Sequence, residues 1–407
     1  MIGTGNNSAT TSTVGKCPIC ESADCFDLLE VSGLPVTVGA LCSTQAQAFK
    51  ATKGDLKLAF CKECSYVWNR AYEPGKHDYV PGYEISLHFS TLYQKFLEDL
   101  AKQLVERYQL HGKTVLEIAC GTGHFLRMLC QLGSNRGIGI DPVLEREGIE
   151  RLNSIQINFI RDKFSERYAD LQCDFVCCRQ ALHAISNPKE LVQVVRRTIG
   201  RDRHTPVYFE VVNASAVFRK QSVWQLMYEY YSFFTPTSLA RLFSECGFDV
   251  RYVQPCYEDG QYLQLEAIPA PAPAPGLTSQ TSSPETDATL DDALVFADGF
   301  RNKIANWEQK LTSIQRSGQR LVAWGAGGRG INFLNLVRAS QFVPYIVDIN
   351  PTRCGGFVPG SGQEVVAPEF LREYRPDLLL LTNPTYEKEV RKQVEEMGIR
   401  CDLLIVS

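Results

Sequence analysis

The sequence predicts an α/β protein with two Rossmann-like units behind a small cysteine-rich domain. Three observations support this class. Apolar strand-like runs alternate with helical stretches over residues 79–266, a Pro/Ala-rich and then Ser/Thr-rich stretch interrupts the pattern at 267–290, and a smaller alternation fills 291–407. Such alternation is typical of a parallel sheet covered on both faces. A chain of 407 residues has room for two or three compact domains.

The composition indicates a folded protein without the electrostatic signature of a nucleic-acid binder. Hydrophobic residues make up 44% of the chain and charged residues 22%, the net charge is −4, and no long Lys/Arg run occurs. No apolar run approaches the roughly 18 to 20 residues of a membrane span, and the first residues hold no apolar signal core. We therefore expect a cytoplasmic protein with a small-molecule substrate and neither a nucleic-acid nor a membrane partner.

The N-terminal part is expected to form a tail and a metal-binding domain. Residues 1–14 are small and polar and are expected to be disordered, whereas residues 15–78 hold two C-x2-C knuckles. Each knuckle can clamp one edge of a tetrahedral site, and four thiolates leave no open position, so we expect a structural Zn²⁺ in preference to free thiols or a redox pair. The four expected ligands are Cys17, Cys20, Cys61 and Cys64.

The remaining elements follow in order along the chain. A helical repeat of leucine and phenylalanine runs from Ser90 to Tyr108. Five strand-like runs then alternate with helices: TVLEIA, GIGID, INFIRD, CDFVCC and PVYFEVV. Residues 267–290 are expected to be a linker, extended in its Pro/Ala half and flexible in its Ser/Thr half. A helix around residues 297–314 and about four strands should form the smaller unit.

The first strand of the larger unit leads into a candidate cofactor turn. Glu117 lies in this strand, and Gly121 and Gly123 follow it before a helix begins. Glycines let the backbone approach a ligand, and helix N–H groups can bind its carboxylate. Glu117 can accept from an ammonium group, and Asp141, ending the second strand, can hold both ribose hydroxyls. This combination indicates S-adenosylmethionine, with Asp162 placed for the adenine amino group; a nucleotide-free fold is the weaker interpretation.

Six longer segments match the pattern of one known family. They are YEISLHFS (83–90), VLEIACGTGHFL (115–126), VYFEVVNA (207–214), YEYYSFFTPTSLARLFSECGF (228–248), VAWGAGGRGINFLN (322–335) and YIVDINPTRCGGFVPGSG (345–362). Through them the chain resembles the S-adenosylmethionine-dependent sugar C-methyltransferases, which act on nucleotide-linked keto-deoxysugars in antibiotic biosynthesis. The resemblance implies a zinc-binding domain, a class I methyltransferase domain and a C-terminal Rossmann-like substrate-binding domain.

The resemblance also implies a mechanism. In such an enzyme a base removes the proton from the carbon beside a ketone, and the resulting enolate takes the methyl group. The family reads His-Glu-His on a helix where this chain reads Tyr-Glu-Tyr at residues 228–230. It reads Arg-His-x-Leu-Glu-His where this chain reads Arg-Gln-Ala-Leu-His-Ala at residues 179–184. The expected histidines are therefore absent.

Four residues remain as candidates for the catalytic work. Glu229 and His183 are candidate bases, and Tyr83 and Tyr230 are expected to assist them. His183 lies one position before a missing histidine, so an exposed histidine in a loop or at the start of a helix is an equally good interpretation of it. Two other functions stay open: methyl transfer to an oxygen of a natural product, and a non-catalytic scaffold that retains the cofactor site.

A second glycine loop opens the smaller unit. Residues 325–330 match G-x-G-x-x-G and Asp348 ends the next strand, which is the pattern of an NAD site. The small size of the unit argues against NAD. In the family this unit is thought to help enclose the nucleotide-sugar, and the N–H groups of the loop can hold a diphosphate.

Overall fold

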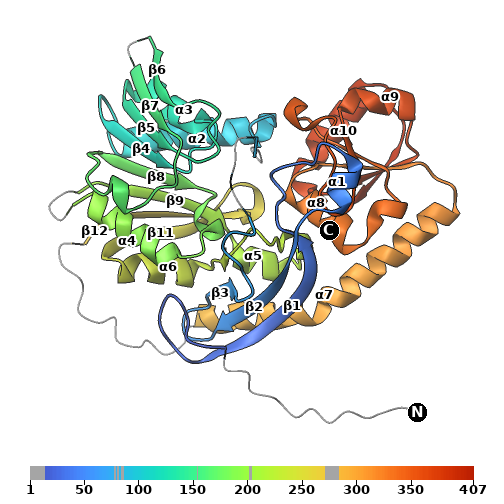
Figure 1. The fold of residues 1–407 in the computed structure, drawn as a ribbon, viewed down its shortest axis with the longest axis horizontal. Helices are drawn as coiled ribbons and strands as arrows, with labels where there is room; N and C mark the ends of the chain where they lie inside the picture. The colour runs from blue at the N-terminus through green and yellow to red at the C-terminus, as the bar shows by residue number, and fades with distance from the viewer. Residues whose placement is uncertain are drawn as a thin grey trace.

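The computed structural model describes residues 14–77, 79, 82–83, 87–153, 155–200, 204–270 and 284–407. These residues form three sheets with four, eight and five strands. In Figure 1 the eight-stranded sheet, cyan to green, lies opposite the C-terminal unit, orange to red, and the blue N-terminal strands lie below and between them. Of the expected tail only Val14 is described, and residues 271–283 of the expected linker lie outside the described residues.

The N-terminal sheet brings the two cysteine knuckles together. Its strands are β1 (Cys25–Pro35), β2 (Lys53–Cys61), β3 (Val67–Asn69) and β10 (Ser232–Phe233), and helix α1 (Gln45–Phe49) lies between β1 and β2. The start of β1 pairs with the end of β2, with Cys25 opposite Cys61. The knuckle before β1 therefore meets the knuckle after β2. Strand β10 comes from the middle of the chain and pairs with β3.

The eight-stranded sheet has the order β11-β12-β9-β8-β4-β5-β7-β6. Its strands are β4 (Thr114–Ile118), β5 (Arg136–Ile140), β6 (Gly148–Leu152), β7 (Ile155–Ile160), β8 (Phe175–Arg179), β9 (Val207–Val212), β11 (Phe248–Cys256) and β12 (Tyr262–Pro269). The five predicted strands are parallel, and β6 and β12 pair antiparallel with their neighbours. The α/β class is confirmed, but the all-parallel sheet that we expected is mixed.

Helices cover both faces of this sheet. They are α2 (Thr91–Arg107), α3 (His124–Gly133), α4 (Pro188–Thr198), α5 (Ala214–Arg219) and α6 (Pro236–Glu245). Val115 in β4 packs in the cluster that contains the apolar residues of α2 and α3. Its neighbour Leu116 packs with those of α4 and α6. Successive residues of β4 thus face opposite layers, which explains why this strand is buried on both faces.

The C-terminal unit is a five-stranded parallel sheet in the order β15-β14-β13-β16-β17. Its elements are α7 (Pro284–Arg316), β13 (Leu321–Trp324), α8 (Gly328–Leu336), β14 (Tyr345–Val347), β15 (Glu364–Val366), α9 (Leu371–Tyr374), β16 (Leu378–Leu381), α10 (Glu387–Glu396) and β17 (Asp402–Ile405). We expected about four strands in this unit, and the structure has five. Strand β15 has only three residues, so it shows no periodicity in the sequence.

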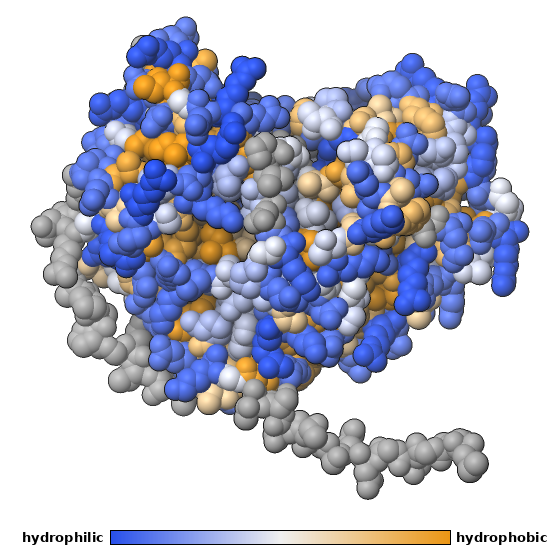
Figure 2. Space-filling view, viewed as in Figure 1, coloured by the Kyte–Doolittle hydropathy of each residue, from blue (hydrophilic) through white to orange (hydrophobic). Residues whose placement is uncertain are grey.

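Contacts between distant segments join the parts of the molecule. Glu389 of α10 accepts from the Ser90 hydroxyl at 2.7 Å and from the Thr91 N–H at 3.1 Å, and so caps the start of α2. Cys42 and Phe357 form an isolated β-bridge between the N- and C-terminal parts. Figure 2 shows a mostly hydrophilic face with apolar residues in small separate areas. Among the described helices, none has the length and apolar character needed to cross a membrane.

A candidate active site between the two Rossmann-like units

The structure brings Gly121, Gly123 and Asp141 together at the end of strand β4. Both glycines have left-handed backbones, with φ of 56° and 82°. A Cβ on Gly123 would lie 2.4 Å from the ring of Phe159, so glycine is required there. The Asp141 carboxylate accepts from the N–H of Gly121 at 2.7 Å and from that of Val143 at 2.8 Å. The turn is thereby fixed to the carboxylate that we expect to hold a ribose.

Glu117 is the one charged group in strand β4, and it is buried. The residue is only 3% exposed. Its carboxylate atom Oε2 has no hydrogen-bond partner among the described residues. Burial raises the pKa of Glu117 to about 8, against the lowering effect of Arg179. Arg179 itself pairs with Glu210 at 3.1 Å. A buried carboxylate oxygen without a donor is costly, and the ammonium group of a ligand would supply one.

Asp162 lies just after β7, where the sequence places it. Its carboxylate accepts from the Tyr168 hydroxyl at 2.6 Å, from Arg167 at 3.1 Å and from the Lys163 N–H at 2.8 Å. These donors fix its orientation and lower its pKa, with the Tyr168 hydrogen bond as the largest cause. Its role toward an adenine ring stays a prediction.

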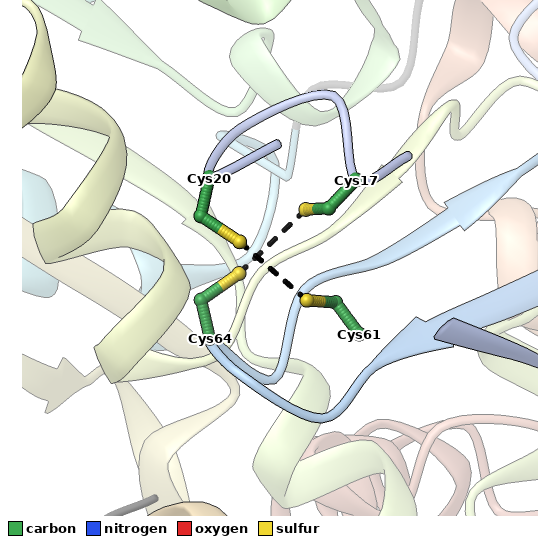
Figure 3. Close-up of side chains that lie close together, drawn as sticks. All are labelled: Cys17, Cys20, Cys61 and Cys64. Atoms are coloured by element: carbon green, nitrogen blue, oxygen red, sulfur yellow. Dashed lines mark hydrogen bonds between the residues drawn. The ribbon is translucent and has the colours of Figure 1, made fainter. Parts of the chain in front are cut away.

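The four cysteines of the two knuckles form one compact cluster. Two Sγ–Sγ distances are 3.7 Å and 3.6 Å, and all four sulfur atoms lie within 4.8 Å of one another. A tetrahedron with metal–sulfur bonds of about 2.3 Å has edges of about 3.8 Å. Figure 3 shows the four side chains pointing from two loops toward a common centre. The donor set and its spacing fit Zn²⁺ and leave no position for a reacting water.

Glu229 lies in a turn, so the helix implied at residues 228–230 is wrong. This turn joins a short 3-10 helix (Val223–Gln225) to β10. The physical reason is tertiary packing: the Tyr228 ring stacks on Tyr72 in the N-terminal domain, whereas the Tyr230 ring meets His183. A turn lets the two rings reach different parts of the molecule while Glu229 stays between them.

The Glu229 carboxylate is buried and well supplied with donors. Its residue is 1% exposed. Its Oε1 accepts from the N–H of Val38 at 2.6 Å and from that of Gly39 at 3.4 Å, and its Oε2 accepts from the Tyr83 hydroxyl at 2.8 Å. The Nε2 atom of His77 lies 3.9 Å from Oε1. Tyr83 therefore contacts Glu229 as a neutral phenol. Burial raises the pKa of Tyr83 well above its usual range.

His183 is buried, so its interpretation as an exposed histidine is wrong. It lies in a 3-10 turn (Leu182–Ala184) and is 3% exposed. Its ring packs edge-on against Tyr230 with centroids 4.4 Å apart. Its Nδ1 has no partner within the described part of the chain, and burial lowers the pKa of His183 to about 3. The imidazole is therefore neutral near pH 7.

One cleft is lined by the candidate acid and base residues and by the second glycine loop. It encloses about 1320 Å³, including its open mouth. Its lining contains His183, Glu229 and Tyr230 from the larger unit and the loop of residues 325–330 from the C-terminal unit. Ala326 and Asn350 donate N–H groups to Asp348, both at 2.8 Å. These bonds repeat the arrangement of Gly121, Val143 and Asp141 in the larger unit.

Two residues of this cleft were missed by the sequence reasoning. Arg329 occupies a variable position of the glycine motif, and the motif itself specifies only the glycines. Asn350 is 3% exposed, and its Nδ2 has no partner in the described structure. A charged residue inside a glycine loop is a signal that could have identified Arg329; nothing in the sequence marks Asn350.

Comparisons with known proteins divide the chain in the same way. A family model described as a methyltransferase domain matches residues 91–253, and one described as a C-methyltransferase C-terminal domain matches residues 273–406. No curated protein matches the chain.

Several solved structures are similar to the larger unit at low identity. The magnesium protoporphyrin IX methyltransferase from Synechocystis PCC 6803, with bound S-adenosylhomocysteine, is 16% identical over 44% of this chain and 84% of its own, with a TM-score of 0.33. The 1,6-didemethyltoxoflavin-N1-methyltransferase from Burkholderia thailandensis is 13% identical over 44% of this chain and 81% of its own, with a TM-score of 0.32. The CurJ carbon methyltransferase is 13% identical over 44% and 56%, with a TM-score of 0.31.

Proposed function

We propose that this chain, an S-adenosylmethionine-dependent C-methyltransferase with a class I methyltransferase fold, methylates the carbon beside the ketone of a nucleotide-linked sugar in secondary metabolism. The observation that carries the acceptor class is the composition of the cleft. The larger unit contributes groups suited to proton transfer to its lining, and the C-terminal unit contributes groups suited to a nucleotide. S-adenosylmethionine supplies an electrophilic methyl group when it is bound beside Glu117.

Arg329 supports an anionic acceptor. Its guanidinium is partly buried in the cleft, and its hydrogen-bond partners are neutral amides: Asn383 Oδ1 and Gln261 Oε1, each at 3.1 Å, and Gln225 with its amide oxygen turned toward Arg329. No carboxylate of the described residues pairs with it. Burial lowers its pKa for this reason. A buried cation without a counter-ion favours a ligand that carries negative charge.

The neighbouring groups suit the rest of a nucleotide. Helix α8 begins at Gly328 and its first residues line the cleft, and the free N–H groups at a helix start can bind a phosphate. The Asn350 Nδ2 offers one further donor. Asp348 accepts from the N–H of its own glycine loop and from the N–H two positions further on, as Asp141 does, and we expect Asp141 to hold the ribose of the cofactor. These features support a diphosphate and a ribose on the C-terminal side of the cleft.

The larger unit supplies the acid and base groups of the cleft. Glu229 carries the carboxyl group among them, and it takes the proton from the carbon beside the ketone. Burial raises the pKa of Tyr230, which stays a neutral phenol and donates a hydrogen bond to the enolate oxygen. His183, neutral at pH 7, accepts a hydrogen bond from a substrate hydroxyl at Nδ1. Tyr83 holds the Glu229 carboxylate in place.

Replacing Glu229 by Gln should lower kcat by about 100- to 10,000-fold, because the amide cannot take the proton. The variant should also lose exchange of the acidic substrate proton with deuterated solvent, which NMR follows without methyl transfer. Binding of S-adenosylhomocysteine should be unchanged. E395Q, a change of an exposed glutamate in α10, is the matched control. Proton exchange at more than half the unmutated rate in E229Q would assign the base to another residue.

Replacing Arg329 by Gln should raise KM for a nucleotide-linked acceptor by roughly 10- to 100-fold, the cost of one lost charge-assisted hydrogen bond. KM for the same sugar without its nucleotide should not change. Steady-state kinetics on both acceptors measures the difference, and R372Q, an exposed arginine of the same unit, is the control. An equal loss on both acceptors would place the anion elsewhere.

The function itself is tested with matched acceptors. The protein is incubated with S-adenosylmethionine and a panel of nucleoside-diphosphate keto sugars, next to the same sugars reduced at the ketone. We expect release of S-adenosylhomocysteine only with keto sugars. Release with the reduced sugars as well would favour transfer to oxygen. Cofactor binding without release on any acceptor would favour the scaffold function.

A further inference from the structure

The segment Val38–Gly39 lies between two charged side chains. Its N–H groups donate to Glu229, at 2.6 Å from Val38 and 3.4 Å from Gly39. Its carbonyl groups accept from Arg353: Gly39 O from Nη1 and Val38 O from Nη2, both at 3.2 Å. A carboxylate thus faces the donor side of this segment and a guanidinium faces its acceptor side. The peptide unit between Val38 and Gly39 is contacted by both charges, through the Gly39 N–H and the Val38 carbonyl, so the two charges polarise it in the same direction and each strengthens the other's hydrogen bond.

Arg353 also contacts the C-terminal glycine loop. Its Nη2 donates to the Ala326 carbonyl at 2.8 Å, and the Ala326 N–H in turn donates to Asp348. Arg353 is 6% exposed and lines the cleft. The same guanidinium therefore holds both the loop that we assign to the nucleotide and the segment that holds Glu229.

The segment has little room to move independently. A Cβ on Gly39 would lie 2.2 Å from the ring of Tyr83. A Cβ on Gly328 would lie 3.4 Å from a methyl group of Val38 and 2.4 Å from Met227. Gly328 of the glycine loop therefore lies close to the Val38 side chain, with no space for an added side chain between Gly328 and Met227.

We infer that Arg353 is a positioning residue that aims the N–H groups of Val38 and Gly39 at Glu229 and couples the glycine loop to this carboxylate. The inference rests on the proposed function only for the role of Glu229 as the base and for the ligand of the loop. The coupling itself consists of contacts within the chain. A purely structural Arg353 would stabilise the C-terminal unit without a selective effect on Val38 and Gly39.

Hydrogen exchange of backbone amides in the full-length protein tests the inference without substrate. In R353M the Val38 and Gly39 amides should exchange at least ~10-fold faster than in the unmutated chain. The amides of Cys42 and Phe357, which bond each other's carbonyl groups at 2.9 Å and 2.8 Å, should keep their protection and show that the parts remain docked. R372M, a change at an exposed arginine, should match the unmutated chain. R353K should restore part of the protection.

A variant of the carboxylate on the other side of the segment, E229Q, gives a second measurement if R353M does not fold. E229Q removes the charge on the other side of the segment and should also speed exchange at Val38 and Gly39 but not at Cys42 or Phe357. Unchanged exchange at Val38 and Gly39 in folded R353M, or an equal loss of protection at all four amides, would overturn the inference. If R353M is unfolded, unchanged exchange in both R353K and E229Q would overturn it.

The coupling to the loop is tested with uridine diphosphate and thymidine diphosphate as probes. A bound probe should slow exchange at Val38 and Gly39 in the unmutated chain and have no such effect in R353M. A probe that binds by calorimetry without slowing exchange would overturn the coupling. If calorimetry detects no binding of either probe, the nucleotide-linked acceptor is contradicted, while the measurements without ligand still decide the role of Arg353.

Discussion

Replacing Glu117 by Gln should weaken binding of S-adenosylmethionine by roughly 10- to 150-fold, the range expected for losing one hydrogen bond to a charged group. The same change should raise the melting temperature of the ligand-free protein. Both effects have one cause. The Glu117 Oε2 is buried without a partner among the described residues, and burial raises the pKa of the group to about 8. The carboxylate destabilises the empty protein and becomes favourable when an ammonium group pairs with it.

The pH dependence of Glu117 follows from this pKa. A glutamate in the unfolded chain has a pKa of about 4.3, so between that value and about 8 the folded state binds more protons than the unfolded state. The contribution of Glu117 to stability is therefore lost as pH rises through this window. Binding of a cationic ligand requires the ionised form, so affinity should rise by up to about tenfold per pH unit between pH 6 and 8.

Calorimetry and thermal unfolding at pH 6, 7 and 8 measure both effects of Glu117. E117Q should bind weakly at every pH and lose the pH dependence of affinity. E147Q, a change of an exposed glutamate in the same unit, should behave as the unmutated chain does. Full affinity in E117Q, with the same pH dependence as before, would show that the ammonium group lies elsewhere.

Replacing Cys61 by Ser should remove the metal and unfold the N-terminal domain. We propose that the four cysteines hold a structural Zn²⁺, because their sulfur atoms have tetrahedral spacing. Structural zinc sites stabilise small domains by an apparent 10 to 16 kcal/mol or so at neutral pH. Because Val38 and Gly39 of this domain hold Glu229, methyl transfer should fall by at least ~100-fold. Cofactor binding at Glu117 should survive.

Metal analysis, limited proteolysis and calorimetry with S-adenosylhomocysteine measure these consequences of C61S. C25S is the matched control, because Cys25 lies next to the knuckles but outside the cluster of four. A C61S protein that keeps one zinc per chain, resists proteolysis within residues 15–77 and retains its activity would contradict the structural zinc site.

Local spacing made the glycine turn after β4 and the cluster of four cysteines predictable. Glu117, Gly121 and Gly123 lie within seven positions of one another, and a strand followed by a glycine turn limits what they can do. The two knuckles of the cysteine cluster are equally local. Five of the strands in the larger sheet were predictable because they are largely buried and form apolar runs. Strand β6 lies at an edge of that sheet and is largely exposed, so no apolar run marks it.

The acid and base half depends on contacts between distant positions, so the sequence could not predict it. Glu229 is held by Val38, which lies 191 positions earlier in the chain. Tyr228 packs against the N-terminal domain, and this contact replaces the expected helix by a turn. His183 is covered by Tyr230, and no pattern around His183 indicates its burial. Tertiary packing overrides local preference at all three positions.

The position of the transferred methyl group tests the proposed function most directly. The protein is incubated with S-adenosylmethionine labelled with carbon-13 in its methyl group and with the keto sugar nucleotide that gives most S-adenosylhomocysteine. Carbon-13 NMR then identifies the atom that carries the label. The proposed function predicts one labelled methyl group, bonded to the carbon beside the ketone. A label on oxygen, or no labelled product from a protein that binds the cofactor, would contradict it.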